Sequence, residues 1–442
     1  MGQAVVGPGG SAVDPRELFR DAGLERGPDG LLRMGGVSLE AVLRDVGSPA
    51  YVYNGGAIRE QYQAIASAFA GTPHQVHFAV KSNSSLAVLK ILKDLGAGAD
   101  IVSGGELQLV TRVGFDPKLV VFSGVGKTDA ELEAAISCRI GGINIESGEE
   151  LTALERIVGR RSVDYPIRLG IRVNPDVAAD AHPYITTGAG GNKFGVPTEQ
   201  VVGLARRIAG NPRFTLVSLA MHLGSQLLDP APFADGATKL IRLIDDIAAL
   251  GIRSIEAVDV GGGLGIRYRD ETPLEPRQLS EVLTPIIAGR GLTLHLEPGR
   301  FVTGSAGVLL TKVLYRKRSG GKDFVVVDAS MTDLVRPSHY HAYHEITEVV
   351  ARGRPVRTVD IVGPVCETGD FLALDRPLPD VETGDHLAIL CAGAYGSVMA
   401  SNYNSRLRAP EVLIDRGRYG VTRVRETLED LLRGETDDPF HR

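Results

Sequence analysis

The chain contains no tryptophan and only three cysteines, and aromatic residues make up 5% of its 442 positions. The cysteines, at positions 138, 366 and 391, are too few and too widely spaced to form a disulfide framework. No apolar run reaches the roughly 18 residues that a membrane span requires. We therefore expect a cytoplasmic protein that does not associate with a membrane.

An excess of positive charge is also lacking. The 48 Lys and Arg residues are outnumbered by 54 Asp and Glu residues, which gives a formal net charge of −6, and no long basic run occurs. Proteins that bind nucleic acid usually concentrate basic residues on one face, so we expect no nucleic-acid partner. A composition of 43% hydrophobic and 23% charged residues is ordinary for a globular protein.

From residue 51 to residue 304, short apolar runs alternate with amphipathic helical patterns such as 84–95, 104–113 and 231–250. Strands that alternate with helices form parallel βα units. The number of such strands is eight, which is the number that closes a (β/α)8 barrel. The eight runs with strand character are 76–81, 99–103, 119–123, 143–146, 167–174, 216–222, 257–260 and 292–297.

The pattern changes after residue 304. Residues 305–442 contain apolar runs separated by Gly, Pro and Asp turns, with few helical patterns, which predicts a C-terminal all-β domain. Within it, the basic run at 316–322 is expected to be a solvated hairpin tip. Residues 15–50 are expected to pack on this domain, and residues 1–14 to form a disordered lead-in.

Polar residues or glycines end all eight predicted strands, where a barrel of this kind builds its active site. Lys81 ends an apolar strand, where desolvation would lower its pKa, as Schiff-base chemistry with an aldehyde requires. The alternative is a lysine that extends its ammonium into solvent at the barrel rim. The glycines at 261–263 would let backbone amides approach a phosphate, although glycine-rich strand ends are often plain turns.

Several motifs, in barrel order, carry a resemblance to a known family. They are AVKSN at 79–83, FSGVGK at 122–127, HLGSQ at 222–226, GGGLG at 261–265, EPGR at 297–300, MTDLVRPSHYHAYH at 331–344, CETGD at 366–370 and GAYGSVMASNYNSR at 393–406. With them the chain resembles the pyridoxal-phosphate enzymes of the alanine-racemase-like fold, or fold type III. Among these it is similar to the diaminopimelate decarboxylase family, which releases CO2 from meso-2,6-diaminopimelate to form L-lysine in the last step of lysine biosynthesis.

The resemblance implies a role for each residue of the site. Lys81 would hold pyridoxal 5′-phosphate, His222 would stack on its ring, and Glu297 would pair with the ring nitrogen. In this family Cys366 donates the proton to the α-carbon and, with Glu367, reaches the neighbouring subunit's site, so a homodimer is expected. The remaining residues implied for the cofactor are Asp100, Ser225, Gly261, Gly262, Gly263, Pro298, Gly299, Arg300 and Tyr395. Those implied for the distal amino acid group of the substrate are Arg300, Arg336, Tyr340, Glu367 and Tyr395.

Two other functions stay open at this point. A decarboxylase of the same fold could act on another basic amino acid or one with a distal carboxylate, on carboxynorspermidine, or on a specialised pathway intermediate. A binding protein with an inactive site is the other alternative, and the presence of both Lys81 and Cys366 argues against it.

Two further features concern metal binding and mobility. The histidines at 339, 341 and 344 lack a second cluster that would complete a zinc site, so no metal is expected. The long glycine-rich segment 176–195 follows a strand end and is predicted to be a mobile lid.

Overall fold

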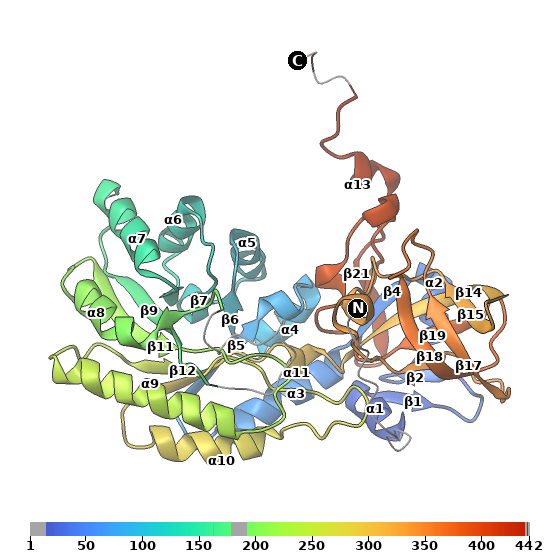
Figure 1. Ribbon diagram of the computed structural model, residues 1–442, viewed down its shortest axis with the longest axis horizontal. Helices are drawn as coiled ribbons and strands as arrows, with labels where there is room; N and C mark the ends of the chain where they lie inside the picture. Colours follow the sequence, from blue (N-terminus) through green and yellow to red (C-terminus); the bar gives the residue numbers. More distant parts are fainter. Residues whose placement is uncertain (1–14, 162, 178–191, 438–439, 441–442) are drawn as a thin grey trace.

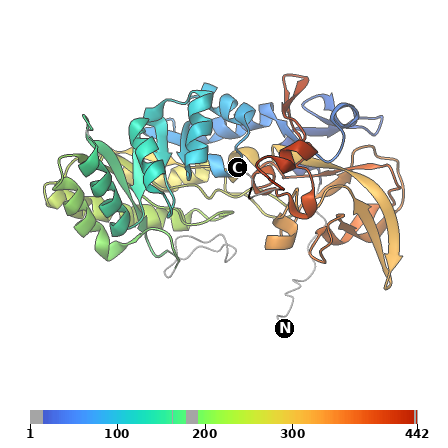
Figure 2. The ribbon, with the colours of Figure 1, turned by 90° about the horizontal axis from the view of Figure 1, so that it is seen from above.

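The computed structural model describes residues 15–161, 163–177, 192–437 and 440, and it divides into a barrel lobe and a β lobe (Figures 1 and 2). Eight parallel strands pair around the barrel, and the pairing of β8 with β9 closes the ring. The predicted (β/α)8 barrel is confirmed. Its strands are β5 (His74–Ala79), β6 (Gly98–Ile101), β7 (Val120–Phe122), β8 (Gly142–Ile145), β9 (Ile167–Asn174), β11 (Phe214–Ala220), β12 (Ala257–Asp259) and β13 (Thr293–Leu296), with a short strand β10 (Val196–Pro197) beside β9.

Helices connect the strands and cover the outside of the barrel (Figure 1). Several of them begin directly at a capping residue: Ser103 accepts a hydrogen bond from the Glu106 amide, and Thr128 and Glu131 form a capping box. Such caps fix where each loop at the carboxyl end of the barrel turns back. The helices are α3 (Gly55–Ala68), α4 (Leu86–Asp94), α5 (Gly104–Val113), α6 (Asp129–Ser137), α7 (Gly148–Arg160), α8 (Thr198–Ala209), α9 (Ala231–Ala249) and α10 (Pro276–Ile287).

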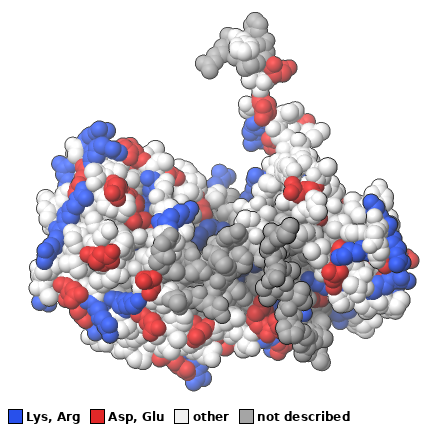
Figure 3. Space-filling view, viewed as in Figure 1, with Lys and Arg blue, Asp and Glu red and all other residues white. Residues whose placement is uncertain are grey.

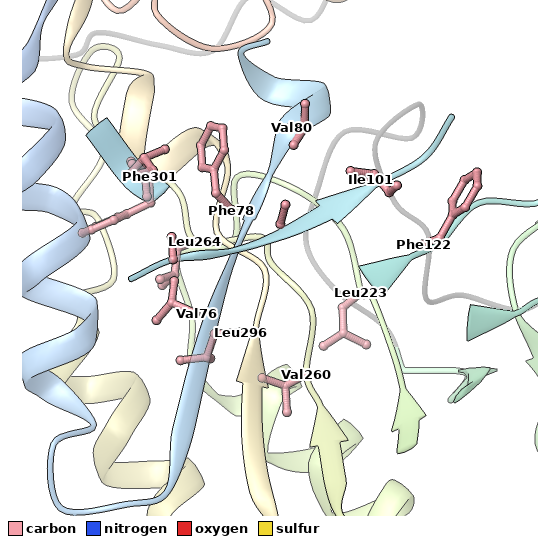
Figure 4. Close-up of a cluster of buried hydrophobic side chains, with 14 of the residues drawn as sticks. Val76, Phe78, Val80, Ile101, Phe122, Leu223, Val260, Leu264, Leu296 and Phe301 are labelled. Atoms are coloured by element: carbon pink, nitrogen blue, oxygen red, sulfur yellow. The ribbon is translucent and has the colours of Figure 1, made fainter. Parts of the chain in front are cut away.

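The barrel has an apolar outer layer and a polar interior. Side chains alternate along a strand, and buried residues such as Val76, Phe78 and Phe122 belong to the apolar cluster (Figure 4). Many of the alternate positions of the strands carry glycine or polar residues. A Cβ at Gly170 would lie 2.0 Å from the Asn144 side-chain oxygen, so the glycine makes room for that polar group. The chemistry of this barrel therefore lies inside the ring of strands.

The β lobe is built on a mostly antiparallel sheet. The turn between β14 and β15 contains Gly320 and Gly321, which confirms the predicted hairpin tip. Because β4 pairs with both β14 and β20, residues 50–54 belong to this sheet, although the predicted barrel domain begins at residue 51. The strands in spatial order are β18 (Phe371–Pro379), β17 (Val356–Val362), β15 (Lys322–Val327), β14 (Gly307–Ser319), β4 (Ala50–Asn54), β20 (Glu411–Asp415) and β21 (Arg418–Arg423), and β16 (Ile346–Glu348) joins through β19 (His386–Ile389).

Residues 15–49 pack on the β lobe. The Leu32 amide donates to the Val349 carbonyl at 2.8 Å, and Leu18 and Met34 are buried in a core that includes Leu390. The short strands of this segment form a separate small sheet. The elements are α1 (Pro15–Ala22), β1 (Leu24–Arg26), β2 (Leu32–Met34), β3 (Val37–Ser38) and α2 (Leu39–Val46). The lead-in predicted at 1–14 lies outside the described residues.

Short helices complete the chain: α11 (Arg300–Thr303), α12 (Arg336–Tyr340) and α13 (Leu428–Leu432), the last of which projects from the body (Figure 1). Within the described part of the chain, no helix combines the length and apolar character needed to cross a membrane. Basic and acidic side chains are intermingled over the face shown in Figure 3.

Candidate active site

A cavity of about 470 Å³ lies at the carboxyl end of the barrel strands and extends to the β lobe. Parallel strands place their carboxyl ends on one rim, so side chains from distant parts of the sequence meet there. The predicted site residues that line it are Lys81, His222, Ser225, Glu297, Arg300, Arg336, Tyr340 and Tyr395.

Lys81 follows β5 in a short helical turn, and its ammonium donates a short hydrogen bond to the fully buried carboxylate of Asp100. Burial by itself lowers the pKa of Lys81, but the negative charges of Asp100 and Glu297 outweigh it and raise that pKa. The expectation of a lowered pKa is therefore wrong, because it counted desolvation and not these two carboxylates. By accepting this hydrogen bond, Asp100 holds the Lys81 side chain in place inside the barrel.

Glu297, directly after β13, is one of three neighbouring buried carboxyls. Burial, followed by the negative charges of Asp100 and Asp259, raises its pKa well above the usual range. Burial likewise raises the pKa of Asp259 to about 6. Asp259 was not among the predicted site residues, although a carboxyl within the buried run AVDV is a signal that could have revealed it.

His222 and the three glycines hold the loops after β11, β12 and β13 together. Burial, together with the charges of Lys81 and Arg172, keeps the pKa of His222 well below 6.5, so its ring is neutral. The Gly262 amide donates to Nδ1 of His222 at 3.2 Å, which assigns the ring proton to Nε2. A Cβ at Gly262 would lie 2.0 Å from the Glu297 carbonyl oxygen, so this position requires glycine. The glycine run is thus more than a plain turn.

Arg300 extends from the start of α11 into the cavity. Its Nε and Nη2 atoms lie 3.2 and 3.0 Å from the Ser225 hydroxyl, and Nη1 lies 2.5 Å from the Tyr268 hydroxyl. Its guanidinium also lies 4.9 Å from the ring centroid of Tyr395. The Pro298 carbonyl accepts a hydrogen bond from the Ala79 amide at 3.2 Å, so this turn packs beside the turn that carries Lys81.

Arg336, at the start of α12, enters the same cavity from the β lobe. His344 donates from Nδ1 to the Leu390 carbonyl, so its Nε2 accepts from Arg336 at 3.0 Å. The Arg336 guanidinium lies 4.6 Å from the ring centroid of Tyr268, which also contacts Arg300. Two buried guanidinium groups in one cavity are suited to binding a carboxylate. His344, one of the three histidines weighed as zinc ligands, instead orients Arg336.

Comparison with known proteins agrees with this geometry. The model of the family "Pyridoxal-dependent decarboxylase, pyridoxal binding domain" matches residues 55–304. The diaminopimelate decarboxylase of Pseudomonas aeruginosa is 48% identical over 401 residues, which cover 91% of this chain and 96% of that protein. This chain belongs to the diaminopimelate decarboxylase family.

Solved structures of the family share the whole architecture. That of the diaminopimelate decarboxylase from Helicobacter pylori complexed with L-lysine matches with a TM-score of 0.86 and 39% identity, over 89% of this chain and 98% of that one. The diaminopimelate decarboxylase from M. jannaschi matches with a TM-score of 0.89 and 33% identity, over 95% and 99% of the two chains.

The family uses pyridoxal phosphate, and the cavity of this member fits that cofactor. Lys81 supplies the amine that an aldehyde needs, and Glu297 supplies a buried acid for a ring nitrogen. The hydroxyl of Ser225 and the guanidinium of Arg300 supply hydrogen-bond donors. Beside them runs the loop at 261–263, whose glycines carry no side chains that would block a phosphate. Asp100 keeps one buried oxygen without a hydrogen-bond partner in the described part of the chain.

Arg172 is a cavity residue that sequence reasoning missed. It forms a buried ion pair with Glu146 at 2.8 Å, and its guanidinium lies 4.8 Å from the ring centroid of Phe194. Glu146 also accepts hydrogen bonds from the amides of Gly124 and Gly195. The signal was an arginine at an inward-facing position of the strand run IRLGIRVN. Most of the lid predicted at 176–195 lies outside the described residues.

Cys366 and Glu367 are not among the described residues that line the cavity of their own chain. Cys366 is exposed, and its amide donates to the side-chain oxygen of Asn404 at 2.8 Å. Glu367 accepts a hydrogen bond from the Tyr403 hydroxyl at 3.1 Å. Cys391, by contrast, is buried, and burial raises the pKa of its thiol to about 12, so it is an inert core thiol.

Proposed function

We propose that this protein decarboxylates meso-2,6-diaminopimelate to L-lysine and CO2. The observation that carries the proposal is that one cavity holds a reactive amine, Lys81, together with two buried guanidinium groups, Arg300 and Arg336. The substrate has two amino acid groups, of which one must react and the other must be recognised. A cavity that pairs an amine with a carboxylate-binding region meets both requirements.

The residues divide the chemistry among them. Pyridoxal phosphate, when bound, would supply the electron sink that loss of CO2 from the substrate α-carbon requires. Lys81 supplies the amine, which Asp100 orients by accepting its hydrogen bond, and Glu297 supplies the acidic partner that a ring nitrogen needs. Arg336, oriented by His344, binds the carboxylate of the amino acid group that does not react. One proton must then be delivered to the α-carbon to complete the product.

We assign that proton to Cys366 of the neighbouring subunit, in a homodimer where each chain's Cys366 and Glu367 complete the partner's site. The loop that bears them is preorganised, since Asp370 accepts hydrogen bonds from the amides of Val365 and Met331, both at 2.6 Å. Its neighbour Tyr403 is 47% exposed, an apolar surface beside the loop that a partner would cover. An exposed, rigid loop outside its own cavity suits a role across an interface.

We also infer that the enzyme works in the cytoplasm on a small amino acid, with no nucleic acid or membrane as a partner. All three cysteines are free thiols, as expected in a reducing compartment. Positive and negative side chains are mixed on the face seen in Figure 3, which offers no basic stripe for a polyanion.

A direct assay tests the proposal. Purified protein is supplied with pyridoxal phosphate and meso-diaminopimelate, and CO2 release is followed together with chiral analysis of the amino acid formed. We expect L-lysine in an amount equal to the CO2, and none from a Lys81→Ala variant. CO2 from carboxynorspermidine but not from diaminopimelate would instead favour a same-fold decarboxylase with a different substrate.

A further inference from the structure

A second cavity, of about 240 Å³, reaches into the barrel from the end opposite the active site. Its lining comes from the amino-terminal parts of the strands and includes His77, His295 and Asp259. Glu297, whose carboxyl interacts with that of Asp259, lines the active-site cavity. The two carboxyls therefore form part of the wall between the cavities.

Asp259 uses its two oxygens differently. Oδ1 accepts a hydrogen bond from the Gly261 amide at 2.8 Å, at the start of the glycine run. Oδ2 is buried and has no hydrogen-bond partner among the described residues. His77 donates from Nδ1 to the Leu119 carbonyl at 3.0 Å, and the residues that the structure describes offer no partner to its Nε2, a second buried acceptor. A buried acceptor without a donor is costly, so Oδ2 of Asp259 favours a proton beside it, whereas the neutral ring of His77 offers its Nε2 only as a hydrogen-bond acceptor.

We propose that Asp259 is a positioning residue that shares a proton with Glu297 and thereby sets the charge which Glu297 presents to the cofactor's ring nitrogen. This inference rests on the proposed cofactor chemistry but not on the identity of the substrate. Two carboxyls in contact within a buried site cannot both ionise freely, so they titrate as a pair. The cavity on the far side of Asp259 is a polar space through which this pair can exchange protons without passing the substrate.

Asp259 can change its protonation state, whereas His77 and His295 in the lower cavity keep a fixed charge state. The histidines near it are neutral, because burial lowers the pKa of His77 to about 4 and that of His295 to about 3. Arg168 and Glu256 pair with each other at the mouth of the lower cavity. The charged and titratable groups that interact with Asp259 or line the lower cavity with it are Lys81, Asp100, Glu297, His74, His77, Lys118, Arg168, Glu256 and His295.

An Asp259→Asn variant separates charge from structure. Asparagine has nearly the same shape, and its side-chain oxygen can still accept from the Gly261 amide, so a purely structural role predicts no change. Without the like charge of Asp259 beside it, Glu297 ionises more readily and presents its full negative charge to the ring nitrogen. We expect the pH at which that nitrogen loses its proton to rise by about one unit.

The measurement is ¹⁵N nuclear magnetic resonance of holoenzyme loaded with pyridoxal phosphate labelled at the ring nitrogen, followed over pH. The matched control is Asp360→Asn, which removes a buried carboxylate that pairs with Lys322 in the β lobe. It should titrate like the unchanged protein. Equal titration of the Asp259→Asn and unchanged proteins would overturn the proposal.

A second variant guards against misfolding. Asp259→Ser also keeps an acceptor near Gly261, and it should show the same direction of shift. If neither variant folds while Asp360→Asn does, Asp259 is structural and the proposal is wrong. Because no substrate is used, a failure of L-lysine formation in the earlier assay is distinguishable from a failure here.

Discussion

Replacing Arg336 by methionine removes a positive charge while keeping most of the side chain's length. Arg336 is only 6% exposed, and its guanidinium stacks on the Tyr268 ring. The guanidinium also donates a 3.0 Å hydrogen bond to His344, which fixes its orientation. Methionine still packs on the Tyr268 ring but cannot donate to a carboxylate. The substitution therefore tests the assigned contact with the distal amino acid group and leaves Lys81 unchanged.

The magnitude follows from the energy of one charged hydrogen bond. A hydrogen bond to a charged group contributes about 1.5–3 kcal/mol. Each 1.36 kcal/mol corresponds to a factor of ten in rate, so kcat/KM for the meso isomer should fall by about 10- to 150-fold. Arg336→Lys keeps the charge but loses the planar pair of donors. Its kcat/KM should therefore lie between those of the unchanged protein and Arg336→Met. Cofactor affinity should not change, since Arg300 and Ser225 are assigned to that end of the cavity.

The assay compares steady-state kinetics on the meso, L,L and D,D isomers with a cofactor titration. Since L-lysine keeps the L-centre of the meso isomer, the centre that loses CO2 must be the D-centre. D-Lysine presents that D-centre without a distal carboxylate, so any turnover of D-lysine should be the same in Arg336→Met and unchanged protein. Normal turnover of the meso isomer by Arg336→Met, or loss of cofactor instead, would refute the placement of this contact.

Three further predictions concern the amine, the assembly and pH. Borohydride treatment of the holoenzyme followed by peptide mapping should label Lys81; a label on another lysine contradicts the assignment. Inactive Lys81→Ala and Cys366→Ala proteins, mixed and allowed to exchange subunits, should recover about a quarter of full activity, because half the dimers carry one intact site; no recovery despite exchange would place the site within one chain. The pKa of His77 is about 4, below its unfolded value near 6.5, so the unfolded chain binds a proton first and stability falls as pH drops through this window. Between pH 7 and pH 4 the free energy of unfolding, measured by denaturant titration, should therefore decrease by up to about 3 kcal/mol less in His77→Gln than in the unchanged protein. An equal decrease in both proteins would refute a buried neutral histidine.

The barrel was predictable because its signals are local and repeated. Eight apolar runs separated by helical patterns leave few other topologies, and a parallel ring brings the strand ends together whatever their separation in sequence. The membership of β4 was not predictable in this way. Its sequence AYVYN would suit either sheet, and its partners β14 and β20 lie more than 250 and 350 residues away. Sheet membership is decided by such distant pairing, which local pattern does not contain.

The missed site residues have one physical cause. A (β/α)8 barrel usually fills its interior with bulky branched side chains, but here glycines such as Gly98 and Gly170 leave room for His77 and Asn144. A search limited to the strand ends misses polar residues that lie two positions earlier in the strand and point into the barrel, such as Arg172 and Asp259.

The error about Lys81 arose from the same omission. Desolvation can be read from an apolar run, but the sign of the shift depends on carboxylates that β6 and β13 bring beside the amine. Strand pairing supplies this information: Ala79 lies opposite Asp100, and Leu296, the residue before Glu297, lies opposite Val76 on the same strand that leads to Lys81. Once a closed barrel is assumed, the inward positions of neighbouring strands can be compared directly. Polar residues that share a layer inside the ring must then be treated as one electrostatic group, which changes the expected pKa of Lys81 from lowered to raised.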